Sequence, residues 1–240
     1  MRLDRFLAEC GIGTRTEVKK IISKGRVSVN GIVNTDASFQ VNESSDSVLL
    51  DSEPVKFTEF EYWMLNKPSG IESVSRKNTA KRGERIPVGE ERFAVDLIKD
   101  SVKTDLFPAG RLDKDTEGLL LITNDGALSH RLLSPKKHVE KTYYTELSGS
   151  LKESDRQMLE NGVDIGDDKP TLPCRINILS DNSCLITITE GRYHQVKRMF
   201  LKAGLIVTYL KRITFGPLVL DPELEPGQYR PLTPEELSEL

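Results

Sequence analysis

The sequence is poor in the residues that build disulfide frameworks and metal sites. Its 240 residues include three cysteines, three histidines and one tryptophan, and aromatic residues make up 6%. The cysteines show no close pairing pattern, which indicates reduced thiols in a cytoplasmic protein. The histidines form no metal-ligand spacing with each other or with the cysteines. We therefore expect neither disulfides nor a bound metal.

Long apolar runs and phosphate-binding glycine loops are also missing. No run of residues approaches the length that spans a membrane, and residues 1–6 lack the apolar core of a signal peptide. None of the glycine patterns that cradle nucleotide phosphates is present. These absences predict a protein with no membrane partner and no cofactor. The length suits one large domain or two smaller ones.

The net charge of −3 argues against a nucleic-acid partner, but the charges are unevenly distributed. Residues 1–34 carry seven basic and three acidic residues, and residues 191–212 carry six basic residues and no acid. Two basic patches on a mildly acidic protein indicate a polyanion that is contacted at defined places. Any one such patch is also common on a solvated helix, so charge alone does not decide.

The first part of the chain predicts a small unit of two helices and a hairpin. Apolar residues recur at helical spacing over residues 3–10, and Thr14 with Glu17 forms a capping box before a second helix that ends at Gly25. An Asn30-Gly31 turn joins two short strands. The acidic, proline-containing residues 51–54 read as a linker, so we place the first domain at residues 1–58.

The remaining residues, 59–240, predict a second domain of the α+β class. Residues 75–92 are polar and rich in Lys, Arg and Gly, which predicts a long loop. Hydrophobic periodicity predicts strands and helices in alternation with turns. One expected strand begins at Tyr62, and another runs through Ile122. Three more strands are expected over residues 141–147, 184–189 and 205–210. The expected helices cover residues 127–133 and 193–203.

A charged loop precedes the apolar strand that runs through Ile122. Residues 110–120 read Gly-Arg-Leu-Asp-Lys-Asp-Thr-Glu-Gly-Leu-Leu. Arg111 and Asp113 are two residues apart, so in extended backbone a cation and a carboxylate face one pocket. A solvated surface turn is the plain alternative. A calcium loop fails because its twelfth position is Asn124 rather than a bidentate Glu.

Four segments in this order and spacing resemble the RNA pseudouridine synthases that act on ribosomal RNA. They are Asn-Lys-Pro at 66–68, the loop at 110–120, Glu-Lys-Thr-Tyr at 140–143, and Glu-Gly-Arg-Tyr-His-Gln-Val-Lys-Arg-Met at 190–199. The last segment resembles the RsuA-type branch, which modifies small-subunit (16S) rRNA. The N-terminal unit resembles the S4-like RNA-binding domain of these enzymes. The resemblance covers essentially the whole chain.

The resemblance implies a mixed, mainly antiparallel sheet with flanking helices, and a role for each matching residue. Asp113 would be the catalytic carboxylate, as nucleophile or as base, and Lys197 its cationic partner. Tyr143 would stack on the flipped uracil, Arg111 would fill the space the base leaves, and Leu210 would pack near the base. Binding of RNA by shape and phosphate would use the N-terminal cations Arg2, Arg5, Arg15, Lys19 and Lys20.

Each assignment has a plain alternative in the residues themselves. Lys197 could be a solvated helix lysine, and Tyr143 and Leu210 could be ordinary core residues. The rival carboxylates are Asp115, Glu117 and Asp125. Isomerising uridine needs no redox change and no net hydrolysis, hence no cofactor.

We expect a monomer that acts on small-subunit rRNA or on a ribosome-assembly intermediate. The same reaction on large-subunit (23S) rRNA is one alternative. A non-catalytic RNA-binding or ribosome-assembly factor is the other.

Overall fold

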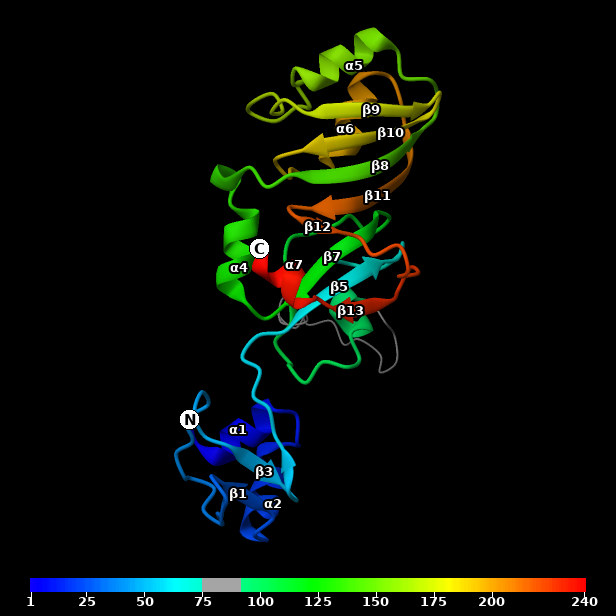
Figure 1. Cartoon of the computed structure of the whole chain (residues 1–240). Helices are drawn as coiled ribbons and strands as arrows, with labels where there is room; N and C mark the ends of the chain where they lie inside the picture. The colour runs from blue at the N-terminus through cyan, green and yellow to red at the C-terminus, as the bar shows by residue number, and fades with distance from the viewer. Residues whose placement is uncertain (75–91) are drawn as a thin grey trace. The chain divides into compact units, whose positions relative to one another are not determined.

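The computed structural model describes residues 1–74 and 92–240, which form two compact units (Figure 1). The first comprises Met1–Glu61 and Asp100–Thr104, and the second comprises Tyr62–Lys99 and Asp105–Leu240. The division that we predicted at residue 58 assigns residues 100–104 to the second domain, whereas their contacts group them with the first unit. The loop predicted over residues 75–92 lies, apart from Arg92, outside the described residues.

The first unit has two helices, α1 (Leu3–Glu9) and α2 (Arg15–Ser23), and a small sheet. The capping box is confirmed, because the Thr14 side chain accepts from the Glu17 amide at 3.3 Å and the Glu17 carboxylate accepts from the Thr14 amide at 2.8 Å. Asn30 and Gly31 both have positive φ, 52° and 81°, as a two-residue hairpin requires. The sheet order is β2 (Ile32–Val33), β1 (Val27–Val29), β3 (Val48–Leu50), β4 (Glu53–Pro54).

Residues 100–104 are held in the first unit by polar and aromatic contacts. The Lys103 ammonium donates to the carbonyl of Glu9 at 3.2 Å and lies 5.1 Å from the centre of the Phe57 ring. Ser101 donates its hydroxyl to a carboxylate oxygen of Glu61 at 2.5 Å. The apolar interior of the unit, formed by both helices and the strands, is separate from that of the rest of the chain.

The second unit is built on a large mixed sheet (Figure 1). Among the described strands, β7 and β11 are the one parallel pair, and all other neighbours are antiparallel. This confirms the mixed, mainly antiparallel sheet. The order is β13 (Tyr229–Pro231), β5 (Tyr62–Lys67), β7 (Glu117–Thr123), β11 (Val207–Phe215), β8 (Lys141–Leu147), β10 (Ser183–Ile188), β9 (Arg175–Ser180), with β6 (Phe107–Pro108) on β7 and β12 (Leu218–Val219) on β11.

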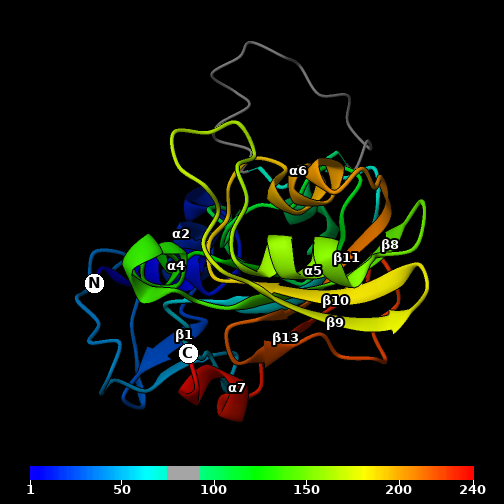
Figure 2. The ribbon, with the colours of Figure 1, turned by 90° about the horizontal axis from the view of Figure 1, so that it is seen from above.

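Alternate side chains of the central strand β7 belong to two different cores, one on each face of the sheet. Leu120 and Ile122 pack in the core that includes helices α5 (Glu153–Glu160) and α6 (Gln195–Lys202). Leu119 and Leu121 pack in the core that includes α4 (Gly126–Leu133). Figure 2 shows α5 and α6 beside β9 and β10. The remaining helices are the short α7 (Pro234–Ser238) and the 3-10 turns η1 (Ala94–Leu97) and η2 (Pro135–Lys137).

Two elements differ from the predicted boundaries for local reasons. Strand β11 extends to Phe215, because Arg212, which looks like a surface residue in sequence, is 2% exposed and continues the ladder. Helix α6 starts at Gln195 rather than at residue 193, since His194 has the left-handed backbone angle φ = 48° and cannot belong to the helix. No helix in the described ranges is long and apolar enough to cross a membrane.

Candidate active site

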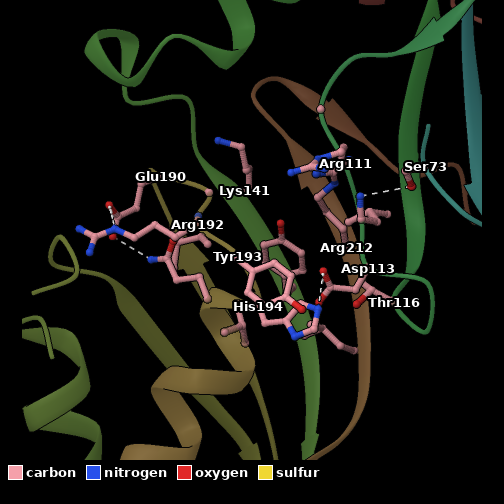
Figure 3. A pocket seen from close by; sticks show the side chains of 18 of the residues that line it. Ser73, Arg111, Asp113, Thr116, Lys141, Glu190, Arg192, Tyr193, His194 and Arg212 are labelled. Atoms are coloured by element: carbon pink, nitrogen blue, oxygen red, sulfur yellow. Dashed lines mark hydrogen bonds and ion pairs between the residues drawn. The ribbon is translucent and has the colours of Figure 1, made fainter. Parts of the chain in front are cut away.

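A pocket of about 610 Å³ opens on the second unit (Figure 3). It is lined by the loop before β7, the first half of β8, the middle of β11, and the residues that lead into α6 together with its first turn. Five residues singled out in the sequence all line it: Arg111, Asp113, Tyr143, Lys197 and Leu210. The structure therefore brings together side chains that lie up to about a hundred residues apart in the chain.

Asp113 lies in a turn that is anchored on both sides. The amide of Thr116 donates to the carbonyl of Asp113 at 3.1 Å, which closes the turn. The preceding residue, Leu112, is 7% exposed, and its amide donates to the Ser73 hydroxyl at 3.3 Å (Figure 3). These anchors fix the backbone and leave the Asp113 carboxylate, 26% exposed, free to face the pocket.

Lys67 holds the Asp113 turn in place through hydrogen bonds to its backbone. Its side chain is fully buried, and its ammonium donates to the carbonyls of Pro68 at 2.9 Å, Lys114 at 3.2 Å and Thr116 at 2.8 Å. Burial lowers the pKa of Lys67 from 10.5 to about 8, against the opposing effect of nearby carboxylates. The Asn-Lys-Pro segment thus positions the Asp113 turn.

Two cationic or potentially cationic side chains flank Asp113. The Lys197 ammonium lies 3.3 Å from Oδ2, and Nε2 of His194 lies 3.5 Å from Oδ1. Both come from the segment at 190–199, His194 just before α6 and Lys197 in its first turn. The His194 ring stacks on that of Tyr193 with centroids 3.9 Å apart, and Figure 3 shows the pair beside Asp113.

Lys197 is shared between two carboxylates, which the sequence does not indicate. Its ammonium is 2.5 Å from Oδ1 of Asp115, and this hydrogen bond lowers the pKa of Asp115. The Asp115 side chain is 70% exposed and does not line the pocket, whereas Asp113 does. Of these two carboxylates, only Asp113 lies inside the pocket.

The other rival carboxylates have structural contacts elsewhere. Glu117 accepts a hydrogen bond from the Tyr209 hydroxyl at 2.7 Å. Asp125 caps helix α4 by accepting from the Leu128 amide at 2.9 Å, and it also accepts from the Tyr62 hydroxyl at 2.9 Å. Neither Glu117 nor Asp125 lines the pocket.

The predicted base-contacting residues form parts of the pocket wall and mouth. Tyr143 on β8 and Leu210 on β11 are 8% and 6% exposed, so they are core residues and pocket residues at once. Arg111 is exposed, and no ion-pair partner of its guanidinium occurs among the described residues. It is therefore a cation at the pocket that is available to an RNA strand.

Sequence reasoning missed two buried cations in this pocket, Lys141 and Arg212. Both line it, and they are 8% and 2% exposed. Alternation along β8 carried the only available signal, because it places Lys141 on the same buried face as Tyr143. Nowhere in the described ranges do three potential metal ligands gather.

The basic segment at 191–212 is less available to RNA than its charge predicts. Arg192 and Arg198 both pair with Asp167, at 3.6 Å and 2.6 Å. Arg192 also donates to the carbonyls of Lys169 and Pro170, so it fastens the loop that precedes β9. With Arg212 buried and Lys197 paired with Asp113 in the pocket, four of the six basic residues serve the fold or the pocket.

The five predicted RNA-binding cations are all exposed on the first unit. Arg2 pairs with Asp4 at 3.0 Å, and Arg5 pairs with Glu9 at 2.6 Å. Lys19 is 3.8 Å from the same Asp4. The other two, Arg15 and Lys20, have no ion-pair partner in the part of the chain that the structure describes.

Comparison with known proteins gives matches along the whole chain. A family model described as RNA pseudouridylate synthase matches residues 61–202, and one described as S4 domain matches residues 1–48. The chain belongs to the RNA pseudouridylate synthase family. An RNA pseudouridine synthase of Bacillus subtilis, named as uncharacterized, is 44% identical over 99% of this chain and 97% of its own length.

Further relatives agree with this assignment. The ribosomal small subunit pseudouridine synthase A of Haemophilus influenzae is 38% identical over 100% of this chain and 99% of its own. A crystal structure of a pseudouridylate synthase is 37% identical, covers 100% of this chain and 99% of its own, and superposes with a TM-score of 0.66. The synthase therefore combines an S4 domain with a pseudouridine synthase domain.

Proposed function

We propose that this synthase converts a specific uridine of small-subunit (16S) rRNA to pseudouridine, with Asp113 as the essential carboxylate. The observation that carries the proposal is the pocket in which Asp113, 3.3 Å from the Lys197 ammonium, shares the lining with Arg111, Tyr143 and Leu210. The full-length similarity to ribosomal small subunit pseudouridine synthases favours the 16S target. The proposal includes a monomeric, cytoplasmic enzyme that acts on free rRNA or on an assembly intermediate.

The reaction explains why such a pocket needs an ionised carboxylate. The bond between C1′ of the ribose and N1 of the uracil breaks, the base turns, and C5 bonds to C1′. Asp113 acts at the sugar, as a nucleophile at C1′ or as a base. The Lys197 ammonium, 3.3 Å from Oδ2, places a positive charge directly beside this carboxylate.

The remaining residues fit the handling of a flipped base. A uridine inside a stacked or paired strand must be extruded before C1′ and C5 can be reached, at a cost of a few kcal/mol. Tyr143 offers a ring and Leu210 an apolar side chain within the pocket. The exposed Arg111 supplies a cation that can fill the vacated space in the RNA.

Asp113→Asn tests the assignment, and Asp115→Asn is its matched control. Both changes keep the side-chain size and remove one negative charge near Lys197. We expect Asp113→Asn to abolish pseudouridine formation in a 16S rRNA transcript while RNA affinity stays near that of the wild type. Asp115→Asn should keep the rate within about threefold, because its carboxylate lies outside the pocket. Equal losses in both variants would refute the distinction between the two carboxylates.

Mapping pseudouridine in rRNA from cells that lack the protein tests the substrate. Loss of one pseudouridine from 16S rRNA is the expected result. A loss from 23S rRNA instead would assign the enzyme to the large subunit. Unchanged modification of both rRNAs would favour a non-catalytic RNA-binding or assembly role.

A further inference from the structure

The pocket that holds Asp113 also contains two buried cations without an anionic partner. Lys141 and Arg212 line it at 8% and 2% exposure (Figure 3). The Lys141 ammonium donates to the Val139 carbonyl at 2.8 Å, and Nε of Arg212 donates to the Leu119 carbonyl at 2.8 Å. Among the described residues, neither forms an ion pair with a carboxylate.

Strand pairing places these cations beside the residues proposed to contact the base. Arg212 on β11 is opposite Tyr143 on β8, and Lys141 is two residues before Tyr143 on the same face. Leu210 has the same relation to Arg212 on β11. Lys141, Tyr143, Leu210 and Arg212 thus form one patch on one face of the sheet, which we call the pocket floor.

The Phe215 ring lies 5.6 Å from the Lys141 ammonium and 4.9 Å from the Arg212 guanidinium carbon, and this aromatic contact offsets only part of the cost of two positive charges in the pocket floor. Burying a charge is costly unless it is paired. An arginine stays charged, and Nη2 of Arg212 is buried with no hydrogen-bond partner. Burial, together with the charge of Arg212, lowers the pKa of Lys141 to about 8. Glu190 acts on Lys141 in the opposite direction, but its carboxylate is paired with Arg192 at 2.9 Å.

A ligand that brings negative charge to the pocket floor would relieve this imbalance. The hydroxyl of Thr116, which also lines the pocket, is a second buried polar group without a partner. Buried polar groups are normally satisfied, so orphans that gather in one pocket indicate a polar ligand. Because Tyr143, which is proposed to contact the base, belongs to this floor, the ligand expected there is the base, whereas the exposed Arg111 is available to the rest of the RNA.

We propose that Lys141 and Arg212 form an oxyanion site for the uracil, in which their positive charges stabilise the base while it is detached from the ribose. This inference rests on the proposed function. When the C1′–N1 bond breaks, its electron pair stays on the uracil and spreads from N1 onto the carbonyl oxygens O2 and O4. C5 then bonds to C1′ and loses its proton, and N1 takes one up, so the product is an uncharged isomer.

Such a site accelerates the reaction because the charge on the base is transient. Stabilisation that exists only while the bond is broken raises the rate without tightening binding of the uridine. Donors that are already fixed in the site need no reorganisation when the charge develops. Removing one such donor typically lowers a rate by about 100- to 1,000-fold.

The test is Lys141→Met in the full chain, measured by single-turnover formation of pseudouridine in a 16S rRNA transcript. We expect the rate to fall by about 100-fold or more, with the RNA dissociation constant within about twofold of the wild type and an unchanged salt slope. Lys141→Arg, which keeps the charge, should restore the rate to within about tenfold of the wild type. Lys152→Met, at an exposed position outside the pocket, is the control and should match the wild type.

Several results would overturn the proposal. An unchanged rate in Lys141→Met would remove Lys141 from the reaction. Weaker binding with a salt slope reduced by about one and an unchanged maximal rate would mean that Lys141 contacts a phosphate instead. Loss of activity in Lys141→Arg equal to that in Lys141→Met would show that the charge is not what matters.

A replacement variant and a check on the wild type complete the experiment. If Lys141→Met does not fold, Arg212→Lys replaces it, since this change keeps a buried cation but loses the planar fork. We then expect a rate about tenfold lower at unchanged affinity, and an unchanged rate would overturn the proposal. Failure of the proposed function is recognised separately, because the wild type itself would then form no pseudouridine in either the transcript or an assembly intermediate.

Discussion

Lys67→Met should lower both the stability of this synthase and its activity. Lys67 is fully buried under the Asp113 turn and donates to three backbone carbonyls. Each hydrogen bond from a charged donor contributes about 1.5–3 kcal/mol. The lowered pKa, from 10.5 to about 8, means that keeping the ammonium charged in the fold costs about 3 kcal/mol. Three such bonds contribute about 4.5–9 kcal/mol against this cost of about 3 kcal/mol, so we expect Lys67→Met to lower the stability at pH 7.5 by about 1.5–6 kcal/mol.

Activity should fall as well, because Lys67 supports the turn that carries Asp113. Without the ammonium, the Thr116 carbonyl loses its 2.8 Å partner and the turn that presents Asp113 loses its support. A misplacement of about 1 Å at a reacting group can lower a rate by about 100-fold. We therefore expect a single-turnover rate about 10- to 100-fold below that of the wild type, with RNA affinity unchanged.

The pH dependence of stability gives the sharper check. The folded pKa of Lys67 lies below the unfolded one, so between about pH 8 and 10.5 the unfolded chain holds the proton and the folded chain does not. Stability contributed by this group therefore rises with pH in that window. Between pH 7.5 and 9 the wild type should gain about 1 kcal/mol that Lys67→Met does not gain.

Urea unfolding followed by tryptophan fluorescence measures this difference in the second unit, which contains Lys67. The single tryptophan, Trp63, lies on β5, the strand that ends at Lys67. Its emission therefore reports on the sheet that carries the site rather than on the S4 domain. Exposed Lys152, replaced by Met, is the control and should follow the wild type. Parallel stability–pH profiles for the wild type and Lys67→Met would refute the idea of a desolvated ammonium under the turn.

Two further predictions concern the close approach of β7 and β11, and RNA binding. Gly118→Ala should destabilise the second unit by about 3 kcal/mol or more, because the added methyl would lie 2.2 Å from the backbone oxygen of Arg212. A urea-unfolding midpoint close to that of the wild type would contradict this prediction. Arg15→Ala combined with Lys19→Ala should weaken rRNA binding and reduce its salt slope by about one for each phosphate that is no longer neutralised, at an unchanged single-turnover rate. Binding measured at two salt concentrations tests this, and a slope equal to that of the Lys152→Met control would mean that these two cations are only solvated.

Sequence patterns predicted those parts of the fold that depend on residues close together in the chain. The capping box at Thr14 and the Asn30-Gly31 turn each depend on residues a few positions apart. Strand β8 was predicted with its observed bounds, since alternate residues from Lys141 to Leu147 are buried and half-exposed in turn. Helix α5 and strand β9 were not predicted, because α5 has a single buried residue, Leu159, and β9 is mostly exposed.

The candidate site was predictable only where a motif carried it. The five pocket residues were found through their resemblance to family segments, and they do line one pocket. Arg212 could not be found in this way, because in sequence it stands next to Lys211 and reads as part of a solvated basic patch. Its burial depends on which face of β11 it occupies. It also depends on the close approach of β7, where Gly118 is paired with Arg212 in parallel register.

The pairing of β7 with β11 explains why the glycine of the Asp113 segment matters to the site as a whole. Gly118 has φ = 97°, and any side chain there would meet the backbone of Arg212. The glycine therefore lets β11 approach β7 directly after the turn that carries Asp113. Because β8 pairs with the other edge of β11, with Tyr143 opposite Arg212, one register brings the carboxylate, the aromatic ring and the buried cation to the same pocket. A residue larger than glycine at position 118 would thus disturb the pocket floor and the Asp113 turn together, although it touches neither the uracil nor the ribose.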